Sequence, residues 1–568
     1  MRSNWSVKKT VFLNLILILI IIIVIPLLLN TIEVNFRIIF ISLMGSLSII
    51  FLIIIMVLDL IFLITKKQNV YFLTMLAMNL SLFLFLIMVY SFVNNSYKIV
   101  YVMYYSNNSL PLIYKIVAIW AGEEGSIMTW MLFNSIIINF YRIGNHNNED
   151  LVFIRSVILS SIISSIFLII LFYLNPFELQ SSSPSDGLGL NPLLISPFMI
   201  WHPFFTFIAY AVFLVPFTII IAEVITPKSK LIELYQDKFY NFALKFGWLV
   251  MSLSIGLGAY WAKIALTWGR YWGWDPVETV SLIPWFFITA FFHTVIFKKK
   301  KPILIKINVA LIFSSIVFST LITRGGGLNS LHTFTEGAEL VIWVVLLGLV
   351  LILLPLYVIY IVLDYLMEEY RNKKLFFDYL SYIFLFGLAF VCIFGLFIPP
   401  FTYLLSNLVP INIVSIGPEY FIITSLILAT GLALSLIFCS LWESFSIKGI
   451  VSVIVIGLLI QIILSFILLF VSNIWINPVL WIYMMSFFSS IFKLAKNLNL
   501  KRGIKYFFRL NSKTIIHAGI SLILAGFLMS ANFQDIFFIP GFILLMIGIV
   551  PSILISFFPT KRQFKQND

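Results

Sequence analysis

Long runs of apolar residues alternate with short polar stretches along almost the whole chain. A run of roughly 20 apolar residues is long enough for a helix to cross the hydrocarbon core of a bilayer. The pattern predicts an all-α, polytopic integral membrane protein with about 16 transmembrane helices, in a range of about 14 to 16. The predicted spans are 11–30, 38–64, 71–93, 117–140, 152–174, 203–225, 246–265, 280–297, 303–323, 338–362, 377–398, 420–442, 450–472, 478–492, 514–531 and 537–558.

The composition agrees with a membrane protein, since 61% of the residues are hydrophobic and only 10% are charged. Soluble domains carry about a quarter charged residues. The first run, residues 11–29, resembles a signal peptide, but its length and the lack of a small-residue cleavage site predict a retained span. Cys392 and Cys439 lie in separate apolar runs without a C-x-x-C pair, so we expect neither a disulfide framework nor a thiolate metal site.

The net charge of +13 does not indicate a nucleic-acid partner, because Lys and Arg gather on the cytoplasmic loops of membrane proteins. With a cytoplasmic N-terminus and alternating spans, all but six of the 36 basic residues fall on the inner side. The six on the outer side are Arg37, Lys98, Lys115, Lys263, Arg270 and Arg324. This asymmetry predicts a multi-pass protein of the cell membrane with its N-terminus in the cytoplasm.

Four polar, glycine-rich and aromatic segments share the outer face in this topology. They are "WAGEEGS" (120–126), "SPFMIWHPFF" (196–205), the tryptophan-rich stretch "TWGRYWGWDPVETVSLIPW" (267–285) and "TRGGGLNSLHTF" (323–334). The other outer loops are plain. We therefore expect the chemistry of the outer face to lie in these four segments.

The histidines fall into two pairs and one solvated residue, His146, in an inner polar loop. His202 and His332 lie on the outer face, on either side of the tryptophan-rich stretch in sequence. A single histidine at an interface is commonly just a polar tip. Two of them flanking one aromatic segment favour a pair of metal ligands.

His293 lies near the cytoplasmic end of span 280–297, and His517 near the cytoplasmic start of span 514–531. Since a helix rises about 1.5 Å per residue, both lie at nearly the same depth. Ionisable residues inside spans are costly and commonly functional, although each would also fit a side chain that reaches the inner interface. Matched depth favours a shared metal, and the absence of thiolates and carboxylates nearby in sequence favours haem iron with two histidine ligands.

The tryptophan-rich stretch holds more rings than an interfacial belt needs. Trp268, Tyr271, Trp272 and Trp274 are expected to form a flat, outward apolar surface that suits the disc of a porphyrin. Asp275 before Pro276 fits a helix cap as well as a site residue. The porphyrin carboxylates would meet Arg324, with Arg270 as a second candidate.

These segments together resemble the haem-handling proteins of cytochrome c maturation that carry the tryptophan-rich WWD motif. The stretch "WGRYWGWDPVETVSLIPW" is the most specific match, and "WAGEEGSIMTW", "ISPFMIWHPFF" and "TRGGGLNSLHTF" resemble three further family segments. "SKTIIHAGISLI" is similar to a late intramembrane histidine segment. The set is closer to the CcmF and NrfE branch than to CcsA, and closest to CcmF. Family members carry an outward domain after the late histidine, where this chain has only "NFQD" (532–535).

The resemblance implies a role for each matched position. His202 and His332 would ligate or guide haem as a substrate on the outer face. His293 and His517 would ligate a resident haem b within the membrane. The residues implied to form the haem platform are Trp268, Gly269, Trp272, Trp274, Asp275 and Glu278.

The implied activity is that of a haem lyase component, which attaches haem covalently to a C-x-x-C-H apocytochrome c; no residue is assigned as catalytic. The implied partners are haem, apocytochrome c, a haem chaperone and other maturation subunits, with quinol as an electron source. A haem transporter or chaperone without bond-forming activity is the alternative, because it needs the same platform. An ion transporter is disfavoured, since most charged residues lie near span ends.

A single membrane domain, 1–568, is expected, because no soluble domain or repeat interrupts the spans. We divide it into N-terminal spans (11–93), a haem-handling core (94–345) with the outer segment 267–285, and C-terminal spans (346–568) that include His517.

Overall fold

The structure is a computed structural model that describes residues 12–557 apart from several segments. The residues not described are 1–11, 13, 67–70, 147, 227–237, 267, 295–301, 325–372, 407–408, 443–445, 473–477, 499–502 and 558–568. The predicted span 338–362 and His332 lie outside the described residues.

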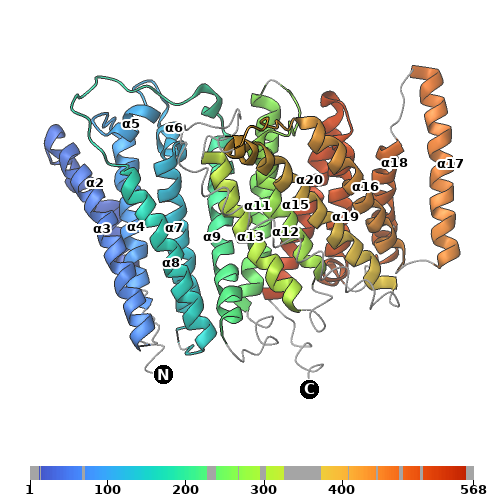
Figure 1. Ribbon diagram of the computed structural model, residues 1–568, viewed down its shortest axis with the longest axis horizontal. Helices are drawn as coiled ribbons and strands as arrows, with labels where there is room; N and C mark the ends of the chain where they lie inside the picture. The colour runs from blue at the N-terminus through green and yellow to red at the C-terminus, as the bar shows by residue number, and fades with distance from the viewer. Residues whose placement is uncertain are drawn as a thin grey trace. The chain divides into compact units, whose positions relative to one another are not determined.

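The described residues form an α-helical membrane protein, which confirms the predicted fold class (Figure 1). Helices satisfy their backbone N–H and C=O groups within one segment, as the hydrocarbon core requires. Eleven of the described helices are long and apolar enough to cross a membrane. In the same residues Ile99 and Leu179 form an isolated antiparallel bridge. The number of about 16 spans and the cytoplasmic N-terminus stay predictions.

Several predicted spans begin at a different residue in the structure, and two of them show why. The span expected at 117–140 corresponds to helix α7 (Glu123–Gly144). The helix begins only at Glu123, because the preceding residue, Gly122, has an extended backbone conformation. The span expected at 514–531 is α19 (Ile504–Phe527), which starts ten residues earlier. The polar residues that hid this start from the hydropathy pattern include Lys505 and Arg509.

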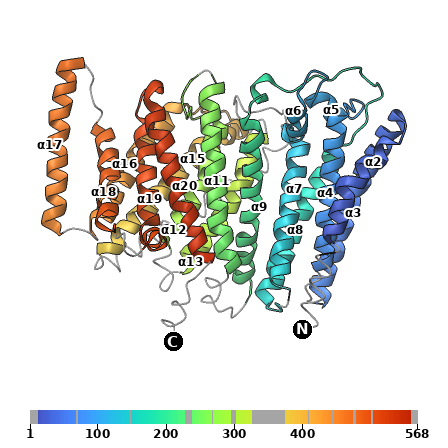
Figure 2. The same ribbon diagram turned by 180° about the vertical axis from the view of Figure 1, so that it is seen from behind.

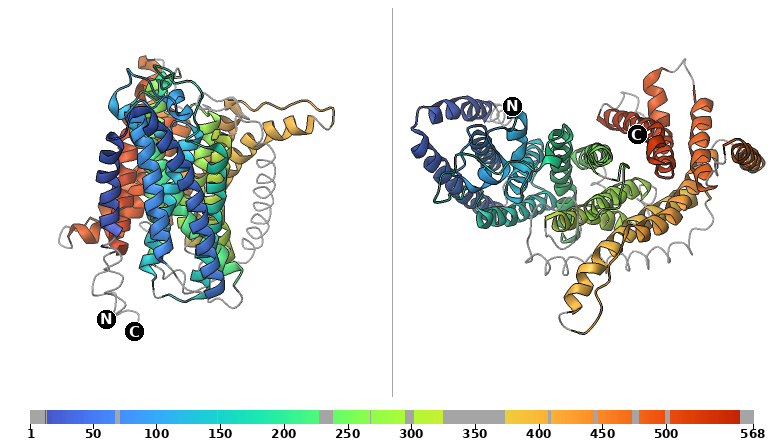
Figure 3. Two further views of the ribbon diagram at one scale, coloured as in Figure 1. Left: turned by 90° about the vertical axis from the view of Figure 1, so that its left-hand side faces the viewer. Right: turned by 90° about the horizontal axis from the view of Figure 1, so that it is seen from above.

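The chain divides into two compact units, Met1–Ser254 (unit 1) and Ile255–Asp568 (unit 2), and helix α11 (Lys238–Ala265) contributes to both. In unit 1, the helices α3, α4, α7, α8 and α9 pack against one another, as the end-on view in Figure 3 shows. The elements of unit 1 are η1 (Ile20–Val24), α2 (Ile25–Asn30), α3 (Val34–Lys66), α4 (Tyr71–Val93), α5 (Val100–Tyr105), α6 (Leu112–Val117), η2 (Ala118–Trp120), α7, α8 (Leu151–Leu174), η3 (Pro192–Leu194) and α9 (Phe198–Val224).

A fully buried ion pair lies inside unit 1. Arg142 Nη1 of α7 lies 2.6 Å from Asp59 Oδ2 of α3, and both side chains are completely buried. Ser161 of α8 donates to the same oxygen at 3.1 Å. A buried charge is costly unless it is paired and hydrogen-bonded, so this cluster holds three helices in one arrangement.

In unit 2, helix α12 packs against α13 and α15, and α19 packs against α18 and α20. Figure 2 shows α19 and α20 side by side from behind. Their close approach needs Gly519 and Gly541, since a Cβ on either would meet the backbone carbonyl of the other at 2.6 and 2.9 Å. The elements of unit 2 are α12 (Pro276–Thr294), α13 (Pro302–Arg324), α15 (Lys373–Ser406), α16 (Pro418–Trp442), α17 (Ile447–Ser472), α18 (Pro478–Lys496), α19, η6 (Ala531–Phe533) and α20 (Gln534–Phe557).

Candidate functional site

Residues 268–275 of the tryptophan-rich stretch lie in the loop between α11 and α12, and the residues from Pro276 onward belong to α12. The backbone of this tryptophan-rich loop is unusual. Gly269 has a φ of +58° and Trp274 a φ of +57°. A bulky residue in the left-handed region is strained, and such strain persists only where the surroundings enforce it. The loop therefore holds Trp274 in a conformation that its own backbone disfavours.

The end of the loop is fixed by two carboxylates at the start of α12. Asp275 Oδ1 accepts a hydrogen bond from the backbone N–H of Val277 at 3.0 Å, which makes Asp275 the helix cap. Pro276 at the first helical position fits the same start. Glu278 Oε2 accepts from the backbone N–H of Gly273 at 2.8 Å. Both carboxylates thus shape the loop, and a role of either in ligand binding stays a prediction.

Tyr271 anchors the middle of the loop to the first turn of α20. Its backbone N–H donates to Gln534 Oε1 at 3.1 Å, and its hydroxyl donates to Asp535 Oδ1 at 2.7 Å. Lys263 of α11 pairs with the same Asp535 oxygen at 2.5 Å and lies 5.0 Å from the Tyr271 ring centre. Burial, followed by the Asp535 hydrogen bond, raises the pKa of Tyr271 above its ordinary value.

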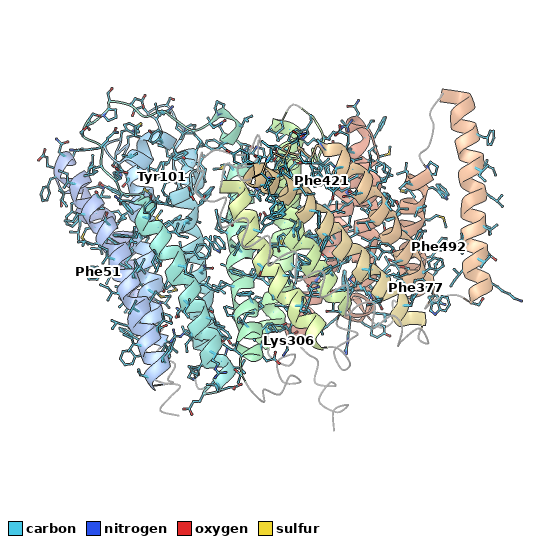
Figure 4. All side chains as sticks on the ribbon, in the orientation of Figure 1. Phe51, Tyr101, Lys306, Phe377, Phe421 and Phe492 are labelled. Atoms are coloured by element: carbon cyan, nitrogen blue, oxygen red, sulfur yellow. The ribbon has the colours of Figure 1, made fainter. Side chains whose placement is uncertain are left out.

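The rings of the loop do not form the flat, open surface that the sequence suggested. Tyr271 and Trp272 are buried in a cluster with Phe538, and Tyr271 stacks on Phe538 at 4.2 Å. Trp272 and Trp274 meet at 82°, and Trp274 stacks on Phe421 of α16 at 5.6 Å. The prediction that the rings form one flat, outward surface is wrong, because residues of α20 and α16 cover part of the loop. Figure 4 labels Phe421 at the upper end of the unit 2 helices.

Two indole N–H groups of the loop have different surroundings. Trp268 Nε1 donates to the Arg270 carbonyl at 3.1 Å, and its ring fills the space where a Cβ on Gly273 would lie. Trp272 Nε1 is buried and has no hydrogen-bond partner among the described residues. A buried donor without a partner costs free energy, so the Trp272 N–H is available to an acceptor on a bound molecule.

His293 and His517 meet at the opposite end of α12. Their ring centres are 6.3 Å apart and their planes are within 7° of parallel. His293 lies in the last turn of α12, and His517 lies 13 residues after the start of α19 rather than close to it. Both side chains are buried, with 8% and 5% of their surface exposed.

The hydrogen bond of His293 leaves one ring nitrogen available. Its Nδ1 lies 3.0 Å from the carbonyl oxygen of Thr289, one turn earlier in α12, so Nδ1 carries the proton and donates. Its Nε2 is buried and has no hydrogen-bond partner among the described residues. A histidine that ligates a metal through Nε2 is commonly oriented by this kind of Nδ1 bond.

The separation of the two rings fits a shared metal. Imidazole–metal bonds of about 2 Å on both sides of one ion would place the ring centres about 6 Å apart, close to the observed 6.3 Å. In the described part of the chain, no three His, Cys, Asp or Glu side chains gather as ligands. Two imidazoles therefore suit an ion that brings its other ligands with it, as haem iron does.

In unit 1, two of the four predicted outer segments lie against each other. Trp120 Nε1 donates to the Met199 carbonyl at 3.0 Å, which ties segment 120–126 to segment 196–205. Gly125 has no room for a side chain, because a Cβ there would lie 1.6 Å from the Ile119 carbonyl oxygen. The half-buried His202 of α9 donates from Nδ1 to the Ser254 carbonyl at 2.8 Å.

Some predicted site residues stay untested, and some neighbours were missed. His332 and the Arg324 side chain lie outside the described residues. Gln534 and Asp535, which hold Tyr271, were regarded only as part of a short connection. Two adjacent polar residues at the start of an apolar span were the available signal.

The comparisons with known proteins agree with these motifs. Residues 120–332 match the family described as cytochrome C assembly protein. The chain is 32% identical over 267 residues to the cytochrome c-type biogenesis protein NrfE of Haemophilus influenzae, covering 46% of this chain and 41% of NrfE. It is 33% identical over 260 residues to the cytochrome c-type biogenesis protein CcmF of Escherichia coli, covering 44% and 39%.

A solved structure described as cytochrome c heme lyase CcmF has a similar fold. The TM-score is 0.63 at 19% identity, over 86% of this chain and 76% of that chain. The sequence alignments cover about two fifths of the length of the curated relatives. The resemblance to CcmF and NrfE is thus confirmed.

We expect the Tyr271→Phe substitution to lower the free energy of unfolding by about 1 kcal/mol, because Asp535 loses a hydrogen bond. The raised pKa in the folded state means that this contribution is complete below pH 10 and is lost as the pH rises above 10. Thermal unfolding of the native protein and of the variant in detergent, at pH 8 and pH 11, measures this difference in stability. An equal difference between native protein and variant at both values would contradict this reading.

Proposed function

We propose that this relative of CcmF and NrfE handles haem in cytochrome c maturation and promotes its covalent attachment to a C-x-x-C-H apocytochrome c. The observation that carries the proposal is the near-parallel pair of His293 and His517 rings, 6.3 Å apart inside a helical membrane protein. The family match of residues 120–332 supports the connection with cytochrome c.

In this proposal His293 and His517 hold a resident haem b. The Thr289 carbonyl orients His293 so that Nε2 faces a ligand position, and the close packing of α19 on α20 fixes His517. A haem with two histidine ligands supplies one-electron transfer when bound. Both rings are buried, which limits the access of water to them.

The tryptophan-rich loop presents the haem that is to be delivered. Trp268 and Trp274, both half-buried, offer aromatic contact, and Trp272 offers a buried N–H. His202 and His332 are the proposed ligands or guides of this haem, with Arg324 as a partner for its carboxylates. We place this site on the outer face of the cell membrane.

The two haem positions lie at the two ends of α12. From Pro276 to His293 the helix rises about 26 Å. This separation keeps the resident haem apart from the delivered one. An electron that enters at the resident haem, from quinol as the proposed donor, would keep the delivered iron reduced.

The protein contributes position rather than reactive groups to the bond-forming step. Each peptide thiol adds across a haem vinyl group. The S–H bond and the vinyl π bond break, one C–S and one C–H bond form, and no oxidant is consumed. Cys392 is fully buried and Cys439 half-buried in their helices, so neither is placed as a competing thiol. Holding the porphyrin and the peptide together lowers the entropic barrier to this reaction. The partners are haem, apocytochrome c, a haem chaperone and other maturation subunits.

His293→Ala and His517→Ala should each abolish a b-type haem absorption, because each removes one of two iron ligands. The measurement is the reduced-minus-oxidised spectrum of purified protein. His146→Ala, in a loop between α7 and α8, is the matched control and should leave the spectrum unchanged. A b-type signal that survives both α12 and α19 variants would eliminate the resident haem.

The double variant Trp272→Ala plus Trp274→Ala should weaken haem binding at the loop by tenfold or more, about 1.4 kcal/mol, and leave the resident haem in place. The reason is the loss of ring contact and of the Trp272 N–H donor. Haem titration of detergent-purified protein measures it. Tyr173→Ala removes a ring that is 81% exposed and serves as the control. Loss of both haem signals together would show that the rings matter for folding instead.

A reconstituted assay separates a haem lyase from a haem chaperone. Vesicles with the purified protein receive haem under reducing conditions and a C-x-x-C-H peptide, and mass spectrometry measures thioether-linked haem. We expect covalent product above a control without protein. Haem transfer to the peptide without thioether formation would favour the transporter or chaperone.

A further inference from the structure

A charged pair lies beside the two histidines, in residues that the haem-handling motifs do not include. Lys513 of α19 places Nζ 2.7 Å from Asp378 Oδ1 of α15. The Asp378 side chain is only 5% exposed, whereas that of Lys513 is 56% exposed. Cys439 of α16 also approaches Asp378, with Sγ 3.9 Å from Oδ1. The pair is therefore a buried carboxylate with one half-exposed cation against it.

The helices place this pair next to His293 and His517. Lys513 lies four residues before His517 in α19, so the two side chains share one face of the helix. Asp378 lies in the first turns of α15, which packs against α12, the helix of His293. Its neighbour Phe377 is labelled at the lower end of the helices in Figure 4.

The charged groups near the two imidazoles are of both signs. Asp378 and Lys513 lie near His293, and Lys513 and Lys493 lie near His517. Lys493 lies in the last turn of α18. Charges act over longer distances in an apolar, membrane-embedded interior than in water. An ion held between the two rings would therefore be exposed to Asp378 with one sign and to the lysines with the other.

We propose that the Lys513–Asp378 pair sets the reduction potential of the resident haem held by His293 and His517. This inference rests on the proposed function, because it needs that haem. Ferric haem carries one more positive charge than ferrous haem. The Asp378 carboxylate stabilises the ferric state and the Lys513 ammonium opposes it, so the pair balances the two states. Both residues act through the charge on the iron and touch neither substrate nor product.

A purely structural role is the competing explanation, since the pair also ties α15 to α19. The two explanations differ in the direction of the effect that they predict for the two single variants. A structural tie predicts that loss of either partner disturbs the haem in the same way. Electrostatic control predicts opposite shifts for the two partners, because removal of a cation and removal of an anion change the local potential in opposite directions.

The experiment is a mediated redox titration of the haem in detergent-purified, full-length protein. Lys513→Gln should lower the midpoint potential of the haem and Asp378→Asn should raise it, each by about 59 mV. At a fixed ambient potential, this shift changes the ratio of ferrous to ferric haem about tenfold. The double variant Lys513→Gln plus Asp378→Asn should return close to the native value. Lys513→Arg and Asp378→Glu keep the charges and should stay near native.

Lys505→Gln is the matched control, because it removes the same charge from the same helix, 12 residues from His517 and on an exposed side chain. Its midpoint should be unchanged. Shifts in the same direction for both single variants, or a bound haem with unchanged potentials, would overturn the inference while leaving the resident haem intact. Native protein without haem would instead count against the proposed function, whatever the variants show.

Discussion

The approach of His293 to His517 is the contact on which the functional interpretation of this structure depends. Two buried imidazoles with parallel rings are costly to place in a membrane interior unless they serve a ligand. The surrounding structure holds them at this separation. The Thr289 carbonyl fixes one ring, and glycines on α19 and α20 let the helix of the other pack closely.

The shape of the tryptophan-rich loop is fixed by a separate set of interactions. Its shape comes from short-range interactions of Asp275 and Glu278 with nearby backbone N–H groups, and from a long-range anchor at Asp535. The anchor buries two of the rings, so the loop is a rigid, partly covered aromatic edge rather than an open shelf. Trp274 has a strained backbone, and the Trp272 N–H has no hydrogen-bond partner among the described residues, so these two rings form the part of the loop that we propose contacts a ligand.

Two groups of polar side chains in unit 2 lie near the ends of α12. His293 and the Lys513–Asp378 pair lie near one end, and Asp275, Glu278 and the Lys263–Asp535 pair lie near the other. We propose that electron transfer occurs at the first of these ends and that haem and peptide are bound at the second. The Lys513–Asp378 pair belongs to the first end and the Lys263–Asp535 pair to the second. The second pair holds the tryptophan-rich loop, whereas the role that we propose for the first is electrostatic.

The sequence by itself determined the membrane fold, the approximate position of most of the described spans and the identity of the aromatic loop, and it gave the cap at Asp275 as one of two interpretations. These features depend on local properties, namely the length of an apolar run and the preferences of a few adjacent residues. The sequence predicts that His293 and His517 lie at a matched depth, but only the packing in the tertiary structure brings their rings together. Tertiary structure also decided the anchoring of Tyr271 by Asp535, 264 residues away, and the burial of Trp272. Contacts between distant residues depend on how helices pack, which no single stretch of sequence specifies.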